Sequence, residues 1–322
     1  MSETPATDSK PGEDNAWERN LISRIALEAL TEQRRARRWS IFFKILLALY
    51  LFALLLLYLP GDWTSAPVGG TSGYTALVEI DGIISSDSTA SADQVVTGLR
   101  RAFKDKNARG VILRINSPGG SPVQAGYIHD EVLRLREKYP EKPVYAVITD
   151  TGASGGYYVA VAADKIYANR ASIVGSIGVI YSGFGFVDTL EKLGIERRVF
   201  SAGDDKALMD PFSPLETDAI RHMRTMLDEI HQQFIDVVRK GRGDRLQEQN
   251  ADLFSGLVWT GEQSVDLGLV DSLASASEVA RDIVGAEEIV DYTVRESYLD
   301  RFARRMGTTL ANEIETEEFK LR

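Results

Sequence analysis

The chain has 322 residues, with 37 Lys and Arg against 47 Asp and Glu, which gives a formal net charge of −10. Charged residues make up 26% and hydrophobic residues 44%, a composition typical of a folded globular protein. The chain contains no cysteine, which excludes disulfides, cysteine-ligated metal sites and a thiol nucleophile. With only three histidines, neither a metal nor a cofactor is expected, and the acidic balance argues against nucleic acid as a partner.

An uninterrupted apolar run, residues 45–59, predicts one transmembrane helix. Four arginines directly upstream, at 34, 35, 37 and 38, favour a cytoplasmic N-terminus and export of everything that follows the run. A cleaved signal peptide rarely has about forty residues before its apolar core. A buried core helix does not need an apolar run on all of its faces. The retained anchor is therefore the preferred interpretation.

This anchor divides the chain into five predicted parts. They are a cytoplasmic tail (1–38), the anchor (39–60), a Pro/Gly/Ser-rich linker (61–73), a folded domain (74–300) and a charged tail (301–322). Within the first part, residues 17–33 have helical apolar spacing. Residues 60–322 hold 40 acidic and 29 basic side chains, so the acidity belongs to the exported side.

The exported part alternates strand-like and helix-like segments. In chain order, the predicted strands are 75–84, 109–116, 143–150, 165–169 and 176–181, and the predicted helices are 91–105, 121–139, 154–164 and 215–240. Ser121 and Pro122 are suited to be the N-cap and first residue of the second helix. This order predicts an α/β fold with a mostly parallel sheet and flanking helices.

Two glycine-rich turns follow predicted strands, at 116–121 and 150–156. Each leaves backbone N–H groups free beside a helix N-terminus, which suits an anion. Neither turn has the glycine spacing of a P-loop or of a dinucleotide site. The second turn places Ser154 in a Gly-x-Ser-x-Gly pattern, which is typical of a nucleophile on a sharp strand-to-helix bend.

Three alternatives remain open for Ser154 at this point. It is a plain helix N-cap, or it is a nucleophile that a histidine activates in an α/β-hydrolase, with His222 and His231 as candidates. Otherwise a lysine is the base, because serine–lysine pairs are a known variant of the catalytic triad. Such a lysine must be desolvated, since only the neutral amine accepts a proton. We expect all three histidines, including His129, to have surface or packing roles.

Five blocks, in order over about 160 residues, resemble peptidase family S49 of the signal peptide peptidase A type, in its short membrane-anchored bacterial form. The blocks are 113–120 (LRINSPGG), 151–158 (TGASGGYY), 168–179, 203–212 and 258–271. The resemblance implies a ClpP/crotonase-like fold. It also implies a place in the bacterial inner membrane, with the catalytic domain in the periplasm.

The resemblance also implies the roles of individual residues. Ser154 is the expected nucleophile, Lys206 the general base, and Ser176 the residue that orients this lysine. The oxyanion hole is expected at Gly119, Gly120 and Gly155. Asp204 and Asp205 directly precede Lys206, and a carboxylate within about 4–6 Å would hold the amine charged. A working site therefore requires both carboxylates to point away from Ser154.

A membrane-anchored serine endopeptidase is thus expected, with remnant signal peptides and other apolar unfolded segments as substrates. The resemblance further implies a homo-oligomeric ring or dome of eight chains, in which neighbours share sites, and 215–240 and 245–275 are candidate interface elements. Three alternatives are a catalytically silent membrane scaffold of the same fold, an acyl-CoA enzyme of the crotonase type and an α/β-hydrolase esterase.

Overall fold

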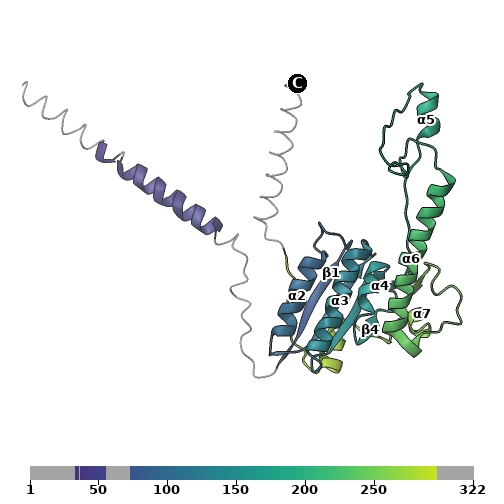
Figure 1. The fold of residues 1–322 in the computed structure, drawn as a ribbon. Helices are drawn as coiled ribbons and strands as arrows, with labels where there is room; N and C mark the ends of the chain where they lie inside the picture. The colour runs from purple at the N-terminus through teal and green to yellow at the C-terminus, as the bar shows by residue number, and fades with distance from the viewer. Residues whose placement is uncertain (1–32, 36, 56–72, 296–322) are drawn as a thin grey trace, which may run out of the picture. The chain divides into compact units, whose positions relative to one another are not determined.

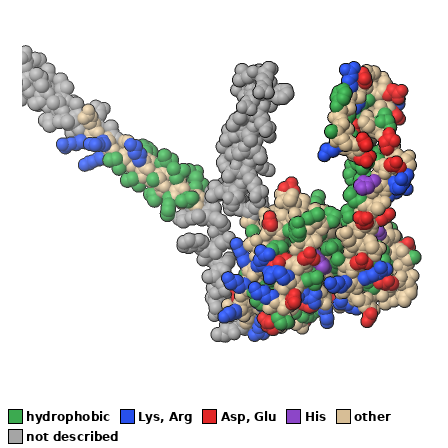
Figure 2. Space-filling model, in the orientation of Figure 1, with side chains coloured by type: hydrophobic (Ala, Val, Ile, Leu, Met, Phe, Trp, Pro, Cys, Tyr) green, Lys and Arg blue, Asp and Glu red, His purple; other side chains and the backbone are tan. Residues whose placement is uncertain are grey.

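The computed structural model describes residues 33–35, 37–55 and 73–295. A helix, Gln33–Leu55, is long and apolar enough to cross a membrane. Its apolar side chains are exposed, and arginines lie at its N-terminal end (Figure 2). It begins before the expected start of the anchor at residue 39. The predicted helix at 17–33, the linker and the C-terminal tail lie almost entirely outside the described residues.

The body, residues 73–295, is built on a mostly parallel sheet with the order β6-β5-β3-β2-β1-β8. β4 branches from β3 and pairs with β7, and only the β5–β6 pair is antiparallel. The strands are β1 (Tyr74–Asp81), β2 (Ala108–Ser117), β3 (Val144–Ala153), β4 (Lys165–Ala168), β5 (Ile173–Gly175), β6 (Val258–Thr260), β7 (Ser272–Leu273) and β8 (Ile289–Asp291). The predicted α/β architecture is confirmed.

Helices cover one face of the sheet and enclose the main core (Figure 1). They are α2 (Ala92–Lys104), α3 (Pro122–Lys138), α4 (Gly155–Ala160) and α6 (Thr217–Arg242). The other helical segments are α5 (Val187–Lys192), η2 (Gly243–Arg245), α7 (Gly261–Asp266), α8 (Ala276–Glu278) and η3 (Val279–Val284). A smaller cluster on the opposite face packs strand side chains such as Leu77 and Ile112 against Val279 and Ala280.

Local sequence signals explain these elements. β1, β2 and β3 are parallel and buried on both faces, so they are continuous apolar runs rather than alternating ones. The Ser121 side chain accepts a hydrogen bond from Gln124 N, and Pro122 is the first residue of α3, which confirms the predicted cap.

One predicted strand is wrong. Residues 176–181 form no strand, and the strand lies just before them as β5. Gly175 and Ser176 both have positive φ, 106° and 50°, which breaks the extended backbone that a strand needs. Within this segment Ile177 is fully buried, whereas Ile180 and Tyr181 are exposed. The helix predicted at 154–164 also ends early, at Ala160.

Candidate active site

A cavity of about 550 Å³ opens at the carboxyl ends of β2 and β3. This is the edge at which open α/β sheets place their sites. Both glycine-rich turns border it, together with the segment after β5 and one side of α6. Its lining residues are Pro118, Gly120, Pro122, Ala125, Ser154, Gly155, Tyr158, Ser176, Gly178, Val179, Ile180, Ile230, Gln233, Phe234, Ser255 and Gly256.

Ser154 occupies the sharp turn between β3 and α4, with φ 51° and ψ −124°. A non-glycine residue at this φ is strained and persists only where the surroundings fix it. Two backbone hydrogen bonds do so: Ser154 N donates to Gly175 O at 2.8 Å, and Tyr158 N donates to Ser154 O at 2.9 Å. The Ser154 side chain makes no capping hydrogen bond, so the plain N-cap interpretation is wrong.

The first glycine-rich turn lies directly against Ser154. A Cβ on Gly119 would come within 2.7 Å of both Ser154 Cβ and Gly155 N. A Cβ on Gly155 would lie 3.3 Å from Gly120 N. The backbone N–H of Gly119 is already used, because it donates to Ser117 Oγ at 3.1 Å.

Two backbone donors at this point are free. Among the described residues, neither Gly120 N nor Gly155 N donates a hydrogen bond. Gly155 begins α4, and the first N–H groups of a helix have no partner within it. The fold therefore brings two unused N–H groups together beside one serine, an arrangement that suits a developing oxyanion.

A substitution at Gly119 tests this close packing. We expect Gly119→Ala to lower kcat for peptide hydrolysis about 10- to 100-fold, because the new methyl group must displace Ser154 or the Gly155 amide. The matched control is Gly126→Ala in α3, where an added Cβ meets nothing within 4 Å. This control should keep full activity and raise the melting temperature slightly, since alanine favours a helix. A fully active Gly119→Ala protein would contradict the packing.

Ser176 also borders the cavity and, like Ser154, has positive φ. Its N–H donates to Leu257 O at 2.8 Å, which continues the pairing of β5 with β6. The preceding Gly175 carbonyl accepts the bond from Ser154 N, so one short segment fixes the backbone of both serines. Ser154, Ser176, Gly120 and Gly155 thus border the same cavity.

Lys206 is the predicted site residue that the fold of one chain does not bring to the cavity. It is exposed, within a segment (182–216) that projects from the body and carries α5 (Figure 1). It is not among the residues that line the cavity. Within this described segment, Lys206 forms no ion pair with Asp204 or Asp205, which are exposed as well.

The histidines lie outside the cavity lining. His129 is buried under Tyr158, with ring centroids 5.2 Å apart, and its burial lowers the pKa of the imidazole. His222 is exposed. The Nε2 of His231 lies 3.0 Å from Ile177 O. Neither α6 histidine lines the cavity that Ser154 borders, so neither is placed as its base.

Sequence reasoning missed the apolar wall of the cavity. Ile230 and Phe234 of α6 supply it, with the Phe234 ring 5.1 Å from that of Tyr158. Their spacing of four residues on a predicted helix was the available signal, because it puts both on one face. The direction of that face depends on how α6 packs, which local sequence does not specify.

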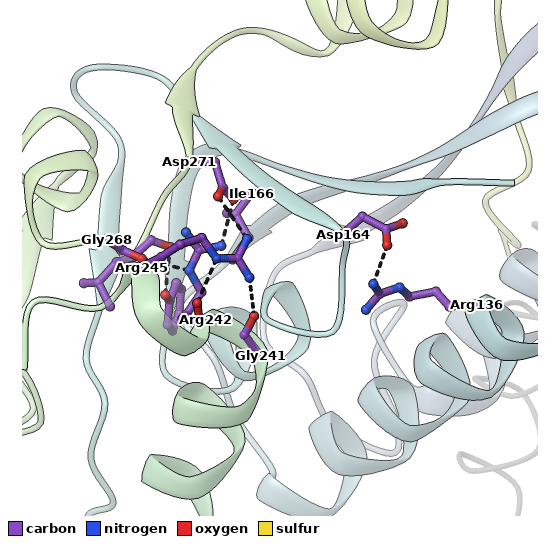
Figure 3. Close-up of polar contacts among 10 residues, drawn as sticks. Arg136, Asp164, Ile166, Gly241, Arg242, Arg245, Gly268 and Asp271 are labelled. Carbon is purple, nitrogen blue, oxygen red and sulfur yellow. Dashed lines mark hydrogen bonds and ion pairs between the residues drawn. The ribbon is translucent and has the colours of Figure 1, made fainter. Parts of the chain in front are cut away.

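The C-terminal end of α6 is fixed to the sheet by an ion-pair network (Figure 3). Arg242 is buried, and it donates to Gly268 O at 2.8 Å and to Asp271 at 2.7 Å. Asp271 also accepts from Arg245 and from Ile166 N. Burial alone would raise the pKa of this carboxyl, but the hydrogen bond from Arg242 and the other donors outweigh it and lower the pKa. One end of α6 is therefore firmly placed.

The family sequence model of peptidase family S49 matches residues 136–288, a range that includes Ser154, Ser176 and Lys206. A Synechocystis protein named "Putative protease slr0021" is 30% identical over 203 residues, which cover 63% of this chain and 70% of that one. An Enterococcus faecium protein named "Putative signal peptide peptidase SppA" is 32% identical over 203 residues, covering 62% and 58%.

A Brucella abortus protein named "Na(+)/H(+) antiporter NhaA" is 44% identical over 187 residues. The shared region is 58% of this chain and only 25% of that protein. The chain thus spans between a quarter and just over half of these two longer relatives, the Brucella and Enterococcus proteins.

Proposed function

Because the chain belongs to peptidase family S49, we propose that it is a serine endopeptidase with Ser154 as its nucleophile. One observation carries the proposal: a strained, uncapped serine borders a cavity, and the free N–H groups of Gly120 and Gly155 lie next to it. These features support an acyl-transfer site in which one chain supplies the nucleophile, the oxyanion donors and a substrate cavity.

The proposed reaction uses Lys206 as the base. The neutral amine of Lys206 takes the Ser154 hydroxyl proton while Ser154 Oγ attacks a peptide carbonyl, and the N–H groups of Gly120 and Gly155 bind the oxyanion. The resulting ammonium then gives its proton to the leaving amine as the acyl-enzyme forms. The same lysine then takes a proton from water as the water oxygen attacks the acyl carbon, and it returns this proton to Ser154 Oγ as the acyl group leaves. Ser176 orients the lysine, and Gly119 provides the clearance that brings the two turns together.

We propose that Lys206 reaches Ser154 of a second copy of this chain in a homo-oligomer. The projecting segment that carries Lys206 exposes large apolar side chains, among them Phe184 at 83% and Phe200 at 96%. Exposed apolar surface of this kind marks an interface. A repeated head-to-tail contact closes into a ring, for which the family resemblance suggests eight chains.

The substrate class follows from the cavity wall and from the N-terminal helix. Tyr158, Ile230 and Phe234 make the wall of the cavity apolar, and we propose that Gln33–Leu55 anchors the enzyme in a bilayer with its body on the extracytoplasmic side. Extended apolar segments at the membrane, including remnants of signal peptides, fit both features.

The test uses the full chain in lipid nanodiscs with two internally quenched peptides. One carries an apolar signal-peptide core, and the other has alternate apolar residues replaced by glutamate. We expect cleavage of the apolar peptide at least tenfold faster in kcat/KM, since each buried apolar side chain adds about 1.5–3 kcal/mol. Intact oligomers that cleave neither peptide would support the silent scaffold and contradict the proposal.

A further inference from the structure

The segment that follows β5 is held in place by three contacts. Gly175 O accepts from Ser154 N, Ser176 N donates to Leu257 O, and Ile177 O lies 3.0 Å from His231 Nε2. The first two contacts are between backbone atoms. The third is made by a side chain, and it comes from α6.

The third contact determines that a proton is bound to Nε2 of the imidazole. A carbonyl oxygen only accepts hydrogen bonds, so His231 Nε2 carries the proton and donates it. Both the neutral ring with its proton on Nε2 and the imidazolium can make this bond. The same bond prevents Nε2 from acting as a proton acceptor. His231 therefore acts as a hydrogen-bond donor through Nε2, and it does not line the cavity that Ser154 borders.

The backbone of this segment is strained, so contacts from other parts of the chain are needed to hold it. Ser176 has φ 50°, a conformation that is unfavourable for a non-glycine residue and relaxes unless neighbours prevent it. Leu257 holds the N-terminal side of the Ser176–Ile177 unit and His231 holds the C-terminal side. Ile177 is fully buried between them, which leaves its peptide group little room to rotate.

His231 itself is well placed to act as a fixed donor. It is half-buried on α6, three residues before Phe234, whose ring packs on Tyr158. The far end of the helix is fixed by Arg242 and Asp271. The imidazole therefore lies on a helix, α6, that contacts with the rest of the body hold in place.

We propose that His231 is a positioning residue for the serine–lysine reaction. Its hydrogen bond to Ile177 O keeps Ser176 in its strained conformation, and Ser176 in turn directs the base toward Ser154. Because Gly175 O holds the amide of Ser154, the same bond also stabilises the turn of the nucleophile. This inference rests on the proposed peptidase function of the same site.

The test compares His231→Gln with His231→Asn. A glutamine amide reaches about as far as Nε2 and can still donate to Ile177 O, whereas an asparagine amide is one bond too short. We expect kcat for the apolar quenched peptide to fall about 10- to 100-fold in His231→Asn and to stay within about threefold in His231→Gln. KM should change less than kcat in both, since α6 keeps its place. His222→Asn, exposed on the same helix, is the matched control and should behave as the wild type.

Titration of Ser154 with a fluorophosphonate gives the fraction of folded sites, so that kcat is counted per competent serine. Equal kcat in the wild type, His231→Asn and His231→Gln would overturn the role of His231, and so would equal losses in the two His231 variants. The pH–rate profile of His231→Gln should keep its shape; loss of an inflection would indicate a base instead. Failure of the proposed function is seen separately, as a Ser154→Ala protein that still cleaves the peptide.

Discussion

Replacing Ser154 with alanine is expected to lower peptide hydrolysis by roughly 10³-fold or more, because removal of the nucleophile leaves only binding and the oxyanion donors. The fold should be kept, since the Ser154 side chain makes no capping hydrogen bond and its backbone contacts remain. The measurement is kcat/KM on the apolar quenched peptide, together with the melting temperature of the full chain in nanodiscs.

The control for this variant is Ser272→Ala, at an exposed position in β7 away from the cavity. It should retain full kcat/KM. If Ser154→Ala kept more than about a tenth of wild-type activity, with the same melting temperature, a nucleophilic role for this serine would be untenable.

Lys206→Ala is expected to be as inactive as Ser154→Ala, because a base and its nucleophile act as a unit. Lys206→Arg should be equally inactive, since a guanidinium keeps the charge but does not give up its proton in proteins. Lys192→Ala, in α5 of the same projecting segment, is the matched control and should be active. An active Lys206→Arg protein would show that charge, and not proton transfer, is what this position supplies.

Co-expression of the two inactive chains separates sites within one chain from shared sites. If Lys206 works on Ser154 of a neighbour, a ring assembled at random from equal amounts of the Ser154→Ala and Lys206→Ala chains regains about a quarter of its sites. Each regained site pairs an intact Ser154 from one chain with an intact Lys206 from the other. If both residues act within one chain, every site stays inactive, and the shared-site arrangement is refuted.

Much of the fold, and the two glycine-rich turns of the site, could be predicted because short stretches of sequence specify them. The buried strands, the Ser121–Pro122 cap and the two glycine-rich turns each follow from a few neighbouring residues. Parallel strands bring their carboxyl ends to one edge, so the turns at 116–121 and 150–156 had to meet there. The closeness of Gly119 to Ser154 is the structural result of that rule.

The parts that local sequence did not predict depend on long-range packing. The apolar segment 176–181 has the pattern of a strand, but Ser176 has positive φ, and the segment contacts Leu257 and His231, which are distant in the sequence. The contribution of Phe234 to the cavity depends on the packing of α6. Lys206 is exposed on the projecting segment, and the contact that we propose for it, with Ser154 of a second copy of the chain, is not encoded in the local pattern of either residue.

The nucleophile is identified most directly by finding which residue a fluorophosphonate modifies. The full chain in nanodiscs is treated with the reagent and digested, and the modified peptide is sequenced by mass spectrometry. We expect a single adduct on Ser154, with labelling lost in Ser154→Ala and strongly slowed in Lys206→Ala. An adduct on another residue, or unchanged labelling of Ser154→Ala, would contradict it.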